Sequence, residues 1–90
     1  MAVFPQLVMS KKIIGEKEVT VASGAVADIT IELGGRYAIV GVPYVYSDNA
    51  DLKVKVVNGG INKFTVEVQN TGTADVTDKI KYEVLVAVGS

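Results

Sequence analysis

The sequence of 90 residues contains no histidine, no cysteine and no tryptophan, and it has only two prolines, two phenylalanines and four leucines. Histidine and cysteine supply many general bases, thiol nucleophiles and zinc ligands, so their absence removes the commonest catalytic and metal-binding sites. The glycine pairs at 34–35 and 59–60 each join one expected strand to another, which is not the strand-to-helix setting of a phosphate-binding loop. We therefore expect no enzymatic activity, no catalytic residues, no cofactor and no bound metal.

An excess of charge of one sign is also lacking. Nine lysine and arginine residues stand against ten aspartate and glutamate residues, and the basic side chains are scattered among apolar ones. Domains that bind nucleic acid carry a basic patch or stripe, so we expect no nucleic-acid partner. No apolar run approaches the length of a membrane span, and the opening residues lack the pattern of a signal peptide. The sequence thus predicts no membrane partner and a chain that stays in the compartment in which it is made.

The abundant residues are those that favour strands. Valine and isoleucine fill 24 positions, and branching at Cβ suits a pleated sheet. Clusters of glycine, asparagine and aspartate divide the chain at intervals of roughly ten residues, which is typical of a sandwich or barrel. The sequence predicts a single all-β domain over residues 1–90, a small antiparallel β-sandwich or barrel of about 6–8 strands. The expected strands are 2–9, 18–23, 27–33, 36–46, 52–57, 63–69 and 79–88.

A glycine-containing turn at residues 58–60 predicts one hairpin in detail. A three-residue loop, with a glycine in the left-handed conformation, pairs Val54 with Phe64 and so places apolar residues opposite each other. The same register sets Lys55 opposite Lys63, a mild repulsion between like charges. We expect this hairpin with this register.

The other glycine pair, at residues 34–35, bears on self-association. A two-residue turn at these glycines places the even-numbered residues of 38–44 on the core face and turns Tyr37 and Ile39 outwards. Leu85 and Ala87 also fall on the face of the last strand that is opposite the core. Hydrophobic residues form 49% of the chain and nine glycines are added to them, more apolar content than a domain of this size readily buries. We therefore expect a homo-oligomer, with Tyr37, Ile39, Leu85 and Ala87 as the candidate oligomer interface.

Residues 1–15 are less regular than the rest. Pro5 cannot donate a hydrogen bond to a sheet, and Gly15 interrupts the apolar run before it. We interpret residues 1–15 as an edge strand or an N-terminal arm. Such an arm would lie across a neighbouring subunit, and the alternative is that the segment packs along the edge of its own sandwich.

The candidate ligand-binding loop consists of Tyr44, Tyr46, Asp48, Asn49 and Asp51. Aromatic rings beside amide and carboxylate groups at the end of a sandwich are suited to binding sugars or partner proteins. A plainer interpretation is that the acidic and amide residues stabilise a turn while the tyrosines close the end of the core. The spacing lacks the glycine and the distal glutamate of an EF-hand, so it does not predict a calcium site.

Residues 42–45, 52–56, 64–70 and 80–86 together resemble the H-type lectin-like β-sandwich. In that family a Phe-x-Val-x-Val strand, a polar loop and a closing strand with an aromatic residue, here Tyr82, follow one another in this order. The resemblance implies a small sandwich that trimerises and occurs in phage tail fibres and other virion parts.

The function implied by this resemblance is that of a non-catalytic structural subunit of a homo-oligomer, a capsid decoration or tail protein. It implies a place in the virion, with assembly in the host cytoplasm and other virion proteins as further partners. The alternative is a lectin-like or adhesion module that binds carbohydrate or protein. In support of an adhesion module, residues 66–74 are similar to the V-x-V-x-N-x-G strand and turn of immunoglobulin-like domains on prokaryotic surfaces.

Overall fold

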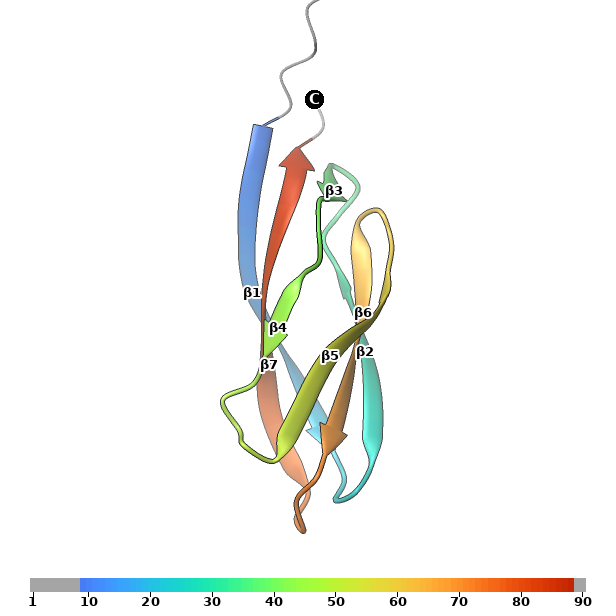
Figure 1. Cartoon of the computed structure of the whole chain (residues 1–90), viewed down its shortest axis with the longest axis vertical. Coiled ribbons are helices and arrows are strands. Elements are labelled where there is room, and N and C mark those ends of the chain that lie inside the picture. Colours follow the sequence, from blue (N-terminus) through green and yellow to red (C-terminus); the bar gives the residue numbers. More distant parts are fainter. Residues whose placement is uncertain (1–8, 89–90) are drawn as a thin grey trace, which may run out of the picture.

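The computed structural model describes residues 9–88 and shows two antiparallel sheets packed face to face (Figure 1). The predicted all-β sandwich is confirmed. Within residues 9–88 no helix is long and apolar enough to cross a membrane. The seven strands are β1 (Met9–Val21), β2 (Val26–Glu32), β3 (Tyr37–Ile39), β4 (Tyr44–Tyr46), β5 (Leu52–Gly59), β6 (Lys63–Asn70) and β7 (Val76–Val88).

The first sheet, called sheet A, is organised around β7. β1 pairs with β7 along the whole length of both strands, while β3 and β4 pair one after the other with its opposite edge. The second sheet, sheet B, has the order β2-β6-β5. β1 and β2 are therefore edge strands of different sheets, and a hydrogen bond of 2.9 Å from Lys17 Nζ to the Thr30 carbonyl joins them across one side of the sandwich.

The core lies between the inner faces of β6 and β7. Both are central strands, so their alternating apolar residues are covered by strands on either side and by the opposite sheet. The ring of Phe64 meets that of Tyr82 edge-on, with centroids 5.8 Å apart. Burial of each large apolar side chain contributes about 1.5–3 kcal/mol. The buried apolar residues are Val19, Val21, Ile31, Leu52, Phe64, Val66, Val68, Ile80, Val84 and Val86.

The hairpin between β5 and β6 forms, but its predicted register is wrong. Val54 lies opposite Val68, and Phe64 lies opposite Gly59. The inner face of β5 nevertheless keeps the apolar residues that the alternation assigned to it, because the shift is by an even number of residues. The pattern thus determined which face of β5 is buried, although it did not determine the partners.

The register shifts because the connection lies further along the chain than predicted, and a bulge between Val56 and Asn58, which adds one residue to β5, makes the shift an even number. The connection lies at residues 60–62, and neither Gly59 nor Gly60 adopts the predicted left-handed conformation. As a consequence Lys55 lies opposite Glu67 and not opposite another lysine. Their charged groups form an ion pair of 3.6 Å.

The predicted two-residue turn after β2 is also wrong. Gly34, with a φ of 101°, begins a link that takes the chain from sheet B to sheet A, where β3 pairs with β7. Tyr37 and Ile39 consequently lie on the inner face and pack against the core. The single strand expected over 36–46 is divided into β3 and β4, with Gly41 at a φ of 86° between them.

β1 runs as one strand through Gly15, where two separate segments were expected. The ring of Tyr82 lies across this position, and a Cβ on Gly15 would be only 2.5 Å from the Tyr82 Cζ. Glycine therefore makes room for an aromatic ring here and does not end the strand. Residues 9–15 belong to this edge strand, and the rest of the expected strand or arm, residues 1–8, lies outside the described residues.

The loop between β6 and β7 is held by the buried side chain of Asn70. Its Nδ2 donates to the carbonyls of Val21 at 3.0 Å and Ala74 at 2.8 Å, and its Oδ1 accepts the N–H of Gly72 at 2.9 Å. The side chain thus connects the end of β1 to the loop. All three bonds are made to backbone groups, and buried or partly buried backbone groups need such partners.

Candidate functional site

The outer face of sheet A, which points away from sheet B, is a continuous surface across three strands. Residues directly opposite each other in antiparallel strands point to the same face. Glu83 of β7 lies opposite Ile14 of β1 and Tyr44 of β4. Leu85, two residues further along the same face, accepts the N–H of Val40 at its carbonyl, at 2.9 Å. Side chains from β1, β7 and the β3–β4 segment therefore adjoin.

Apolar side chains are exposed on this surface and beside it, a group we call the outer patch. A single exposed apolar residue is ordinary, whereas a contiguous group commonly marks an interaction surface. The link between β3 and β4 contributes its two valines beside the strand residues. The exposed fractions are 69% for Ile14, 45% for Val40, 86% for Val42, 60% for Tyr44 and 50% for Leu85.

Ion pairs between lysines and carboxylates lie among and below these apolar residues. Each is exposed to solvent, so each contributes at most about 1 kcal/mol to stability. Their more important effect is that lysines and carboxylates alternate, which leaves the face without a dominant charge. The pairs are Lys12 with Glu83 at 3.2 Å, Lys79 with Glu16 at 3.2 Å, and Lys81 with Asp48.

Lys81 brings together three of the predicted ligand-binding residues. The rings of Tyr44 and Tyr46 are stacked, with centroids 5.2 Å apart and planes inclined by 30°. The Lys81 Nζ lies 5.9 Å from the centroid of Tyr46 and donates a hydrogen bond to Asp48. This hydrogen bond, with the charge of Asp48, raises the pKa of Lys81. The two rings and the ion pair form one small aromatic and polar surface.

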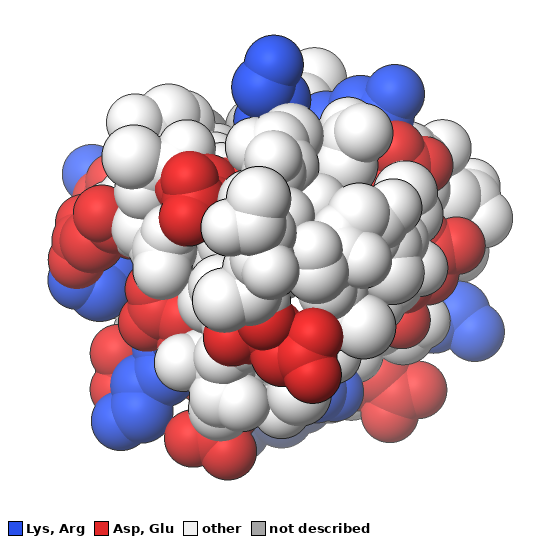
Figure 2. Space-filling view, turned by 90° about the horizontal axis from the view of Figure 1, so that it is seen from below, with Lys and Arg blue, Asp and Glu red and all other residues white. Residues whose placement is uncertain are grey.

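The other two predicted ligand-binding residues belong to the turn between β4 and β5. Asn49 Oδ1 accepts the N–H of Asp51 at 2.9 Å, and the Asp51 carbonyl accepts the backbone N–H of Thr71 at 2.8 Å. These bonds shape the turn and attach it to the loop after β6. Figure 2 shows the end of the molecule on which this loop lies, where acidic atoms stand among uncharged ones and basic atoms lie at the periphery.

No group of three or more metal-ligating side chains gathers within residues 9–88. The hydrogen bonds of Asn49 and Asp51 are those of the plainer interpretation made from the sequence, in which these residues stabilise a turn. The tyrosines, in contrast, do not close the end of the core, because both lie on the outer face of sheet A.

The candidate oligomer interface is divided by the fold. Leu85 and Ala87 lie on the outer face of sheet A, as predicted from the last strand. Tyr37 and Ile39 lie on the inner face, so their placement with Leu85 and Ala87 on one surface is wrong. The physical reason is the crossing of the chain between sheets after β2, which inverts the face that each residue of β3 presents.

Three residues of the outer patch were missed in the sequence: Ile14, Val40 and Val42. A signal for Ile14 exists, because adjacent residues of a strand point to opposite faces and Ile13-Ile14 therefore cannot both be buried on one side. Val40 and Val42 were assigned to the core by the turn that does not form. Their exposure could be recognised only after the pairing of β3 was known.

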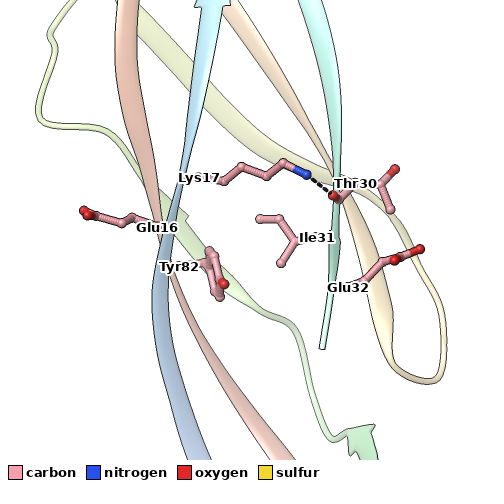
Figure 3. A pocket seen from close by; sticks show the side chains of 6 residues that line it. All are labelled: Glu16, Lys17, Thr30, Ile31, Glu32 and Tyr82. Atoms are coloured by element: carbon pink, nitrogen blue, oxygen red, sulfur yellow. Dashed lines mark hydrogen bonds between the residues drawn. The ribbon is translucent and has the colours of Figure 1, made fainter. Parts of the chain in front are cut away.

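A groove lies on a different side of the molecule, between the edges of β1 and β2 (Figure 3). Figure 3 shows Lys17 reaching from β1 to β2, with Tyr82 and Ile31 between the two strands. Two adjoining hollows of about 450 and 440 Å³ share Glu32 and Tyr82 in their walls. They form one open groove, walled by apolar side chains and by the charged residues of the two edges.

Comparison of the chain with family models, with curated proteins and with solved structures found no match. The resemblance to the H-type lectin-like sandwich thus stays a prediction. Inferences about function rest on the outer patch, on the aromatic surface beside it and on the edge strand β1.

Proposed function

We propose that this protein is a non-catalytic structural subunit that assembles with copies of itself through the outer face of sheet A. The observation that carries the proposal is the outer patch, in which apolar side chains from β1, β7 and β4 are half or more exposed on one surface. Exposed apolar groups of this kind are stabilised when another surface removes them from water.

A second copy is the partner that the charges favour. The lysines and carboxylates on the face are nearly balanced, with Lys12 and Glu83 paired inside the patch and further pairs below it. A face of this kind neither attracts nor repels a strongly charged partner, whichever sign that partner carries. Two copies of the face can place the lysines of each against the carboxylates of the other while the apolar centres meet.

The assembly that we propose is a trimer within a virus particle, as a capsid decoration or tail component. This part of the proposal rests on the resemblance of residues 42–45, 52–56, 64–70 and 80–86 to the H-type lectin-like sandwich. The outer patch supports self-association in general and does not by itself distinguish three copies from two.

The test is the mass of the protein in solution, measured by light scattering after size-exclusion chromatography. The variant Leu85→Glu removes an exposed apolar group from the outer patch and sets a carboxylate opposite Lys12, which favours the fold. We expect an oligomer for the wild type and a lower mass for Leu85→Glu. The matched control is Val26→Glu, because Val26 is similarly exposed, at 54%, but lies in sheet B. A wild type that remains a monomer at high concentration contradicts the proposal.

A lectin-like module is the second candidate, and the stacked pair of Tyr44 and Tyr46 favours it. The rings lie beside the charged pair of Lys81 and Asp48, so apolar and polar groups are available within one small surface. A glycan array distinguishes the two functions. Carbohydrate binding that is lost in the double variant Tyr46→Ala, Asp48→Ala and retained in Leu85→Glu would support the lectin-like module.

A further inference from the structure

The free edge of β1 is the longest strand edge in the part of the chain that the structure describes. β1 runs for 13 residues along the border of sheet A, whereas strands usually have about 3–10 residues. Within residues 9–88 its backbone forms hydrogen bonds with the backbone of β7 and with that of no other segment. In Figure 1 the upper half of β1 forms the left border of the molecule. Such an edge offers unpaired N–H and C=O groups to a strand of another chain.

The other edge strands carry features that oppose pairing with a copy of themselves. Both charged residues of β2 are acidic, Asp28 and Glu32. Both charged residues of β5 are basic, Lys53 and Lys55, and β5 also contains a bulge. β3 and β4 have only three residues each, and like charges, bulges and short strands all hinder the association of edges. β1 has charges of both signs and pairs regularly with β7 throughout, so it lacks this protection.

The charges of β1 are placed so that two copies of this strand complement each other. Ile14 lies on the outer face, with Lys12 two residues before it and Glu16 two residues after it on the same face. In an antiparallel pair with a two-fold axis at Ile14, the two Ile14 side chains lie opposite each other. Each Lys12 then lies opposite Glu16 of the other copy. Residues that are directly opposite have Cβ atoms about 4.5–5.5 Å apart, where opposite charges stabilise the pair.

We propose that two copies pair through the free edges of β1 in this register, so that sheet A continues from one subunit into the other. The inference rests on the proposed function in requiring self-association, but the surface is a different one. Ile14 is 69% exposed and belongs to the outer patch, so this pairing places two outer patches side by side. Glu16 then lies between Lys81 of its own β7 and Lys12 of the other copy, in a row of alternating charges.

The position of the axis follows from the charges. An axis at Lys12 or at Glu16 sets two like charges directly against each other. An axis at Ile13 leaves Lys12 opposite Ile14, and an axis at Gly15 leaves Ile14 opposite Glu16, so that an apolar residue faces a charged one. Of these five positions, Ile14 alone gives an apolar contact at the centre with an ion pair on each side.

The cost of this register lies on the inner face of β1, where Lys11 comes opposite Lys17 of the other copy. Both ammonium groups are already directed to groups of their own subunit. The Nζ of Lys17 donates to the Thr30 carbonyl at 2.9 Å, and the Nζ of Lys11 lies over the ring of Tyr37, 5.8 Å from its centroid. These contacts draw the two charges towards sheet B and β3, and the open groove beside β1 admits water that weakens their repulsion.

Charge reversal tests the pairing, because two variants that fail alone should associate when mixed. Lys12→Glu sets two glutamates opposite each other, and Glu16→Lys sets two lysines opposite each other. A two-fold contact joins copies, or assemblies of copies, in pairs, so each variant alone should have about half the wild-type mass in light scattering after size-exclusion chromatography. An equimolar mixture restores both opposite pairs and should recover the wild-type mass. Recovery on mixing also shows that neither variant is unfolded.

The matched control is Glu18→Lys, which changes the net charge by the same amount as Glu16→Lys. Both glutamates are exposed, and each lies opposite a lysine of β7. Across the proposed interface, however, Glu18 lies opposite Ser10, which is uncharged. Glu18→Lys should therefore keep the wild-type mass. A loss of mass in Glu18→Lys but not in Glu16→Lys would place the axis elsewhere and contradict the proposal.

A cysteine on the two-fold axis gives a second measurement, because the chain has no cysteine of its own. Ile14→Cys places two thiols opposite each other, at a Cβ separation close to that of a disulfide. Leu85→Cys is the control, since Leu85 is 50% exposed on the same outer face but belongs to β7, one strand away from the edge. We expect Ile14→Cys to form a disulfide-linked dimer several-fold more abundantly than Leu85→Cys. A contact through the outer face alone does not favour Ile14→Cys.

The inference is overturned if Glu16→Lys keeps the wild-type mass, if the mixture fails to recover it, or if the two cysteine variants link equally. If any of these results is found while Leu85→Glu lowers the mass, the contact through the outer face stands and the edge pairing is wrong. If Leu85→Glu keeps the mass and the charge-reversed variants behave as expected, the edge pairing stands and the outer face is not the interface. A wild type that stays monomeric at high concentration overturns both.

Discussion

Removal of the Asn70 side chain tests how the lower end of the sandwich is held together. Asn70→Ala deletes two donated hydrogen bonds and one accepted hydrogen bond, all with backbone partners. A hydrogen bond contributes about 0.5–1.5 kcal/mol net, so three of them amount to about 3 kcal/mol. Domains of this size are stable by about 5–13 kcal/mol, so the loss is a large part of the total. It corresponds to a fall in Tm of about 12–24 °C.

The assay is urea unfolding followed by far-UV circular dichroism, with the free energy of unfolding extrapolated to water. The control is Thr71→Ala, which deletes one exposed hydrogen bond, from the Thr71 hydroxyl to the Asp51 carbonyl, at 2.9 Å. We expect it to cost less than about 1 kcal/mol. The reasoning is refuted if Asn70→Ala costs no more than Thr71→Ala at an unchanged urea dependence.

A second variant at the same position separates the two donated bonds from the accepted one. Asn70→Asp keeps an acceptor for the Gly72 N–H but turns a carboxylate towards the carbonyls of Val21 and Ala74. These carbonyls disfavour the charged form, so the folded-state pKa of the introduced carboxyl is raised above its unfolded value of about 3.9. The folded state then binds more protons, and stability rises as the pH falls towards the unfolded pKa. The wild type serves as the reference at each pH.

Two further variants test local contacts. Gly15→Ala places a Cβ 2.5 Å from the Tyr82 Cζ, and such overpacking costs about 1–3 kcal/mol. In the background Tyr82→Ala, the same glycine substitution should have little effect on Tm, and an equal loss in both backgrounds contradicts the contact. Asp48→Asn removes the partner that raises the pKa of Lys81 above 10.5. The wild type should have a higher Tm than this variant below pH 10.5. This difference in Tm should vanish as the pH rises through the folded pKa of Lys81. A difference in Tm that does not depend on pH rules out the ion pair as its source.

Much of the local order of this fold could be predicted from the sequence. The alternation in β7 correctly placed Ile80, Val84 and Val86 on one buried face. The hairpin of β5 and β6 was predicted, because two alternating runs are separated by glycines. Its register was not, because the place of the connection at residues 60–62 and the bulge between Val56 and Asn58 depend on how the strands fit their neighbours.

The candidate site was predicted in part for the same reason. Tyr44, Tyr46 and Asp48 do lie together, but the residue that joins them is Lys81, which is 33 positions from Asp48 along the chain. Neither spacing nor composition indicates a contact across that separation. The groove between β1 and β2 likewise depends on the packing of two sheets and has no counterpart in the local sequence.

The amino-acid sequence by itself determined the all-β class, the approximate strands and the sets of residues that share a face. These properties follow from local preferences, namely β-branching, turn residues and an alternation of period two. For residues 37–42, only the tertiary structure decided which of the two faces is inside. Tyr37 and Ile39 share one face, and Val40 lies with the opposite set, as the alternation requires, yet Tyr37 and Ile39 are the ones packed against the core. That choice depends on β3 pairing with β7 and not with β2, a long-range pairing that leaves the outer patch exposed.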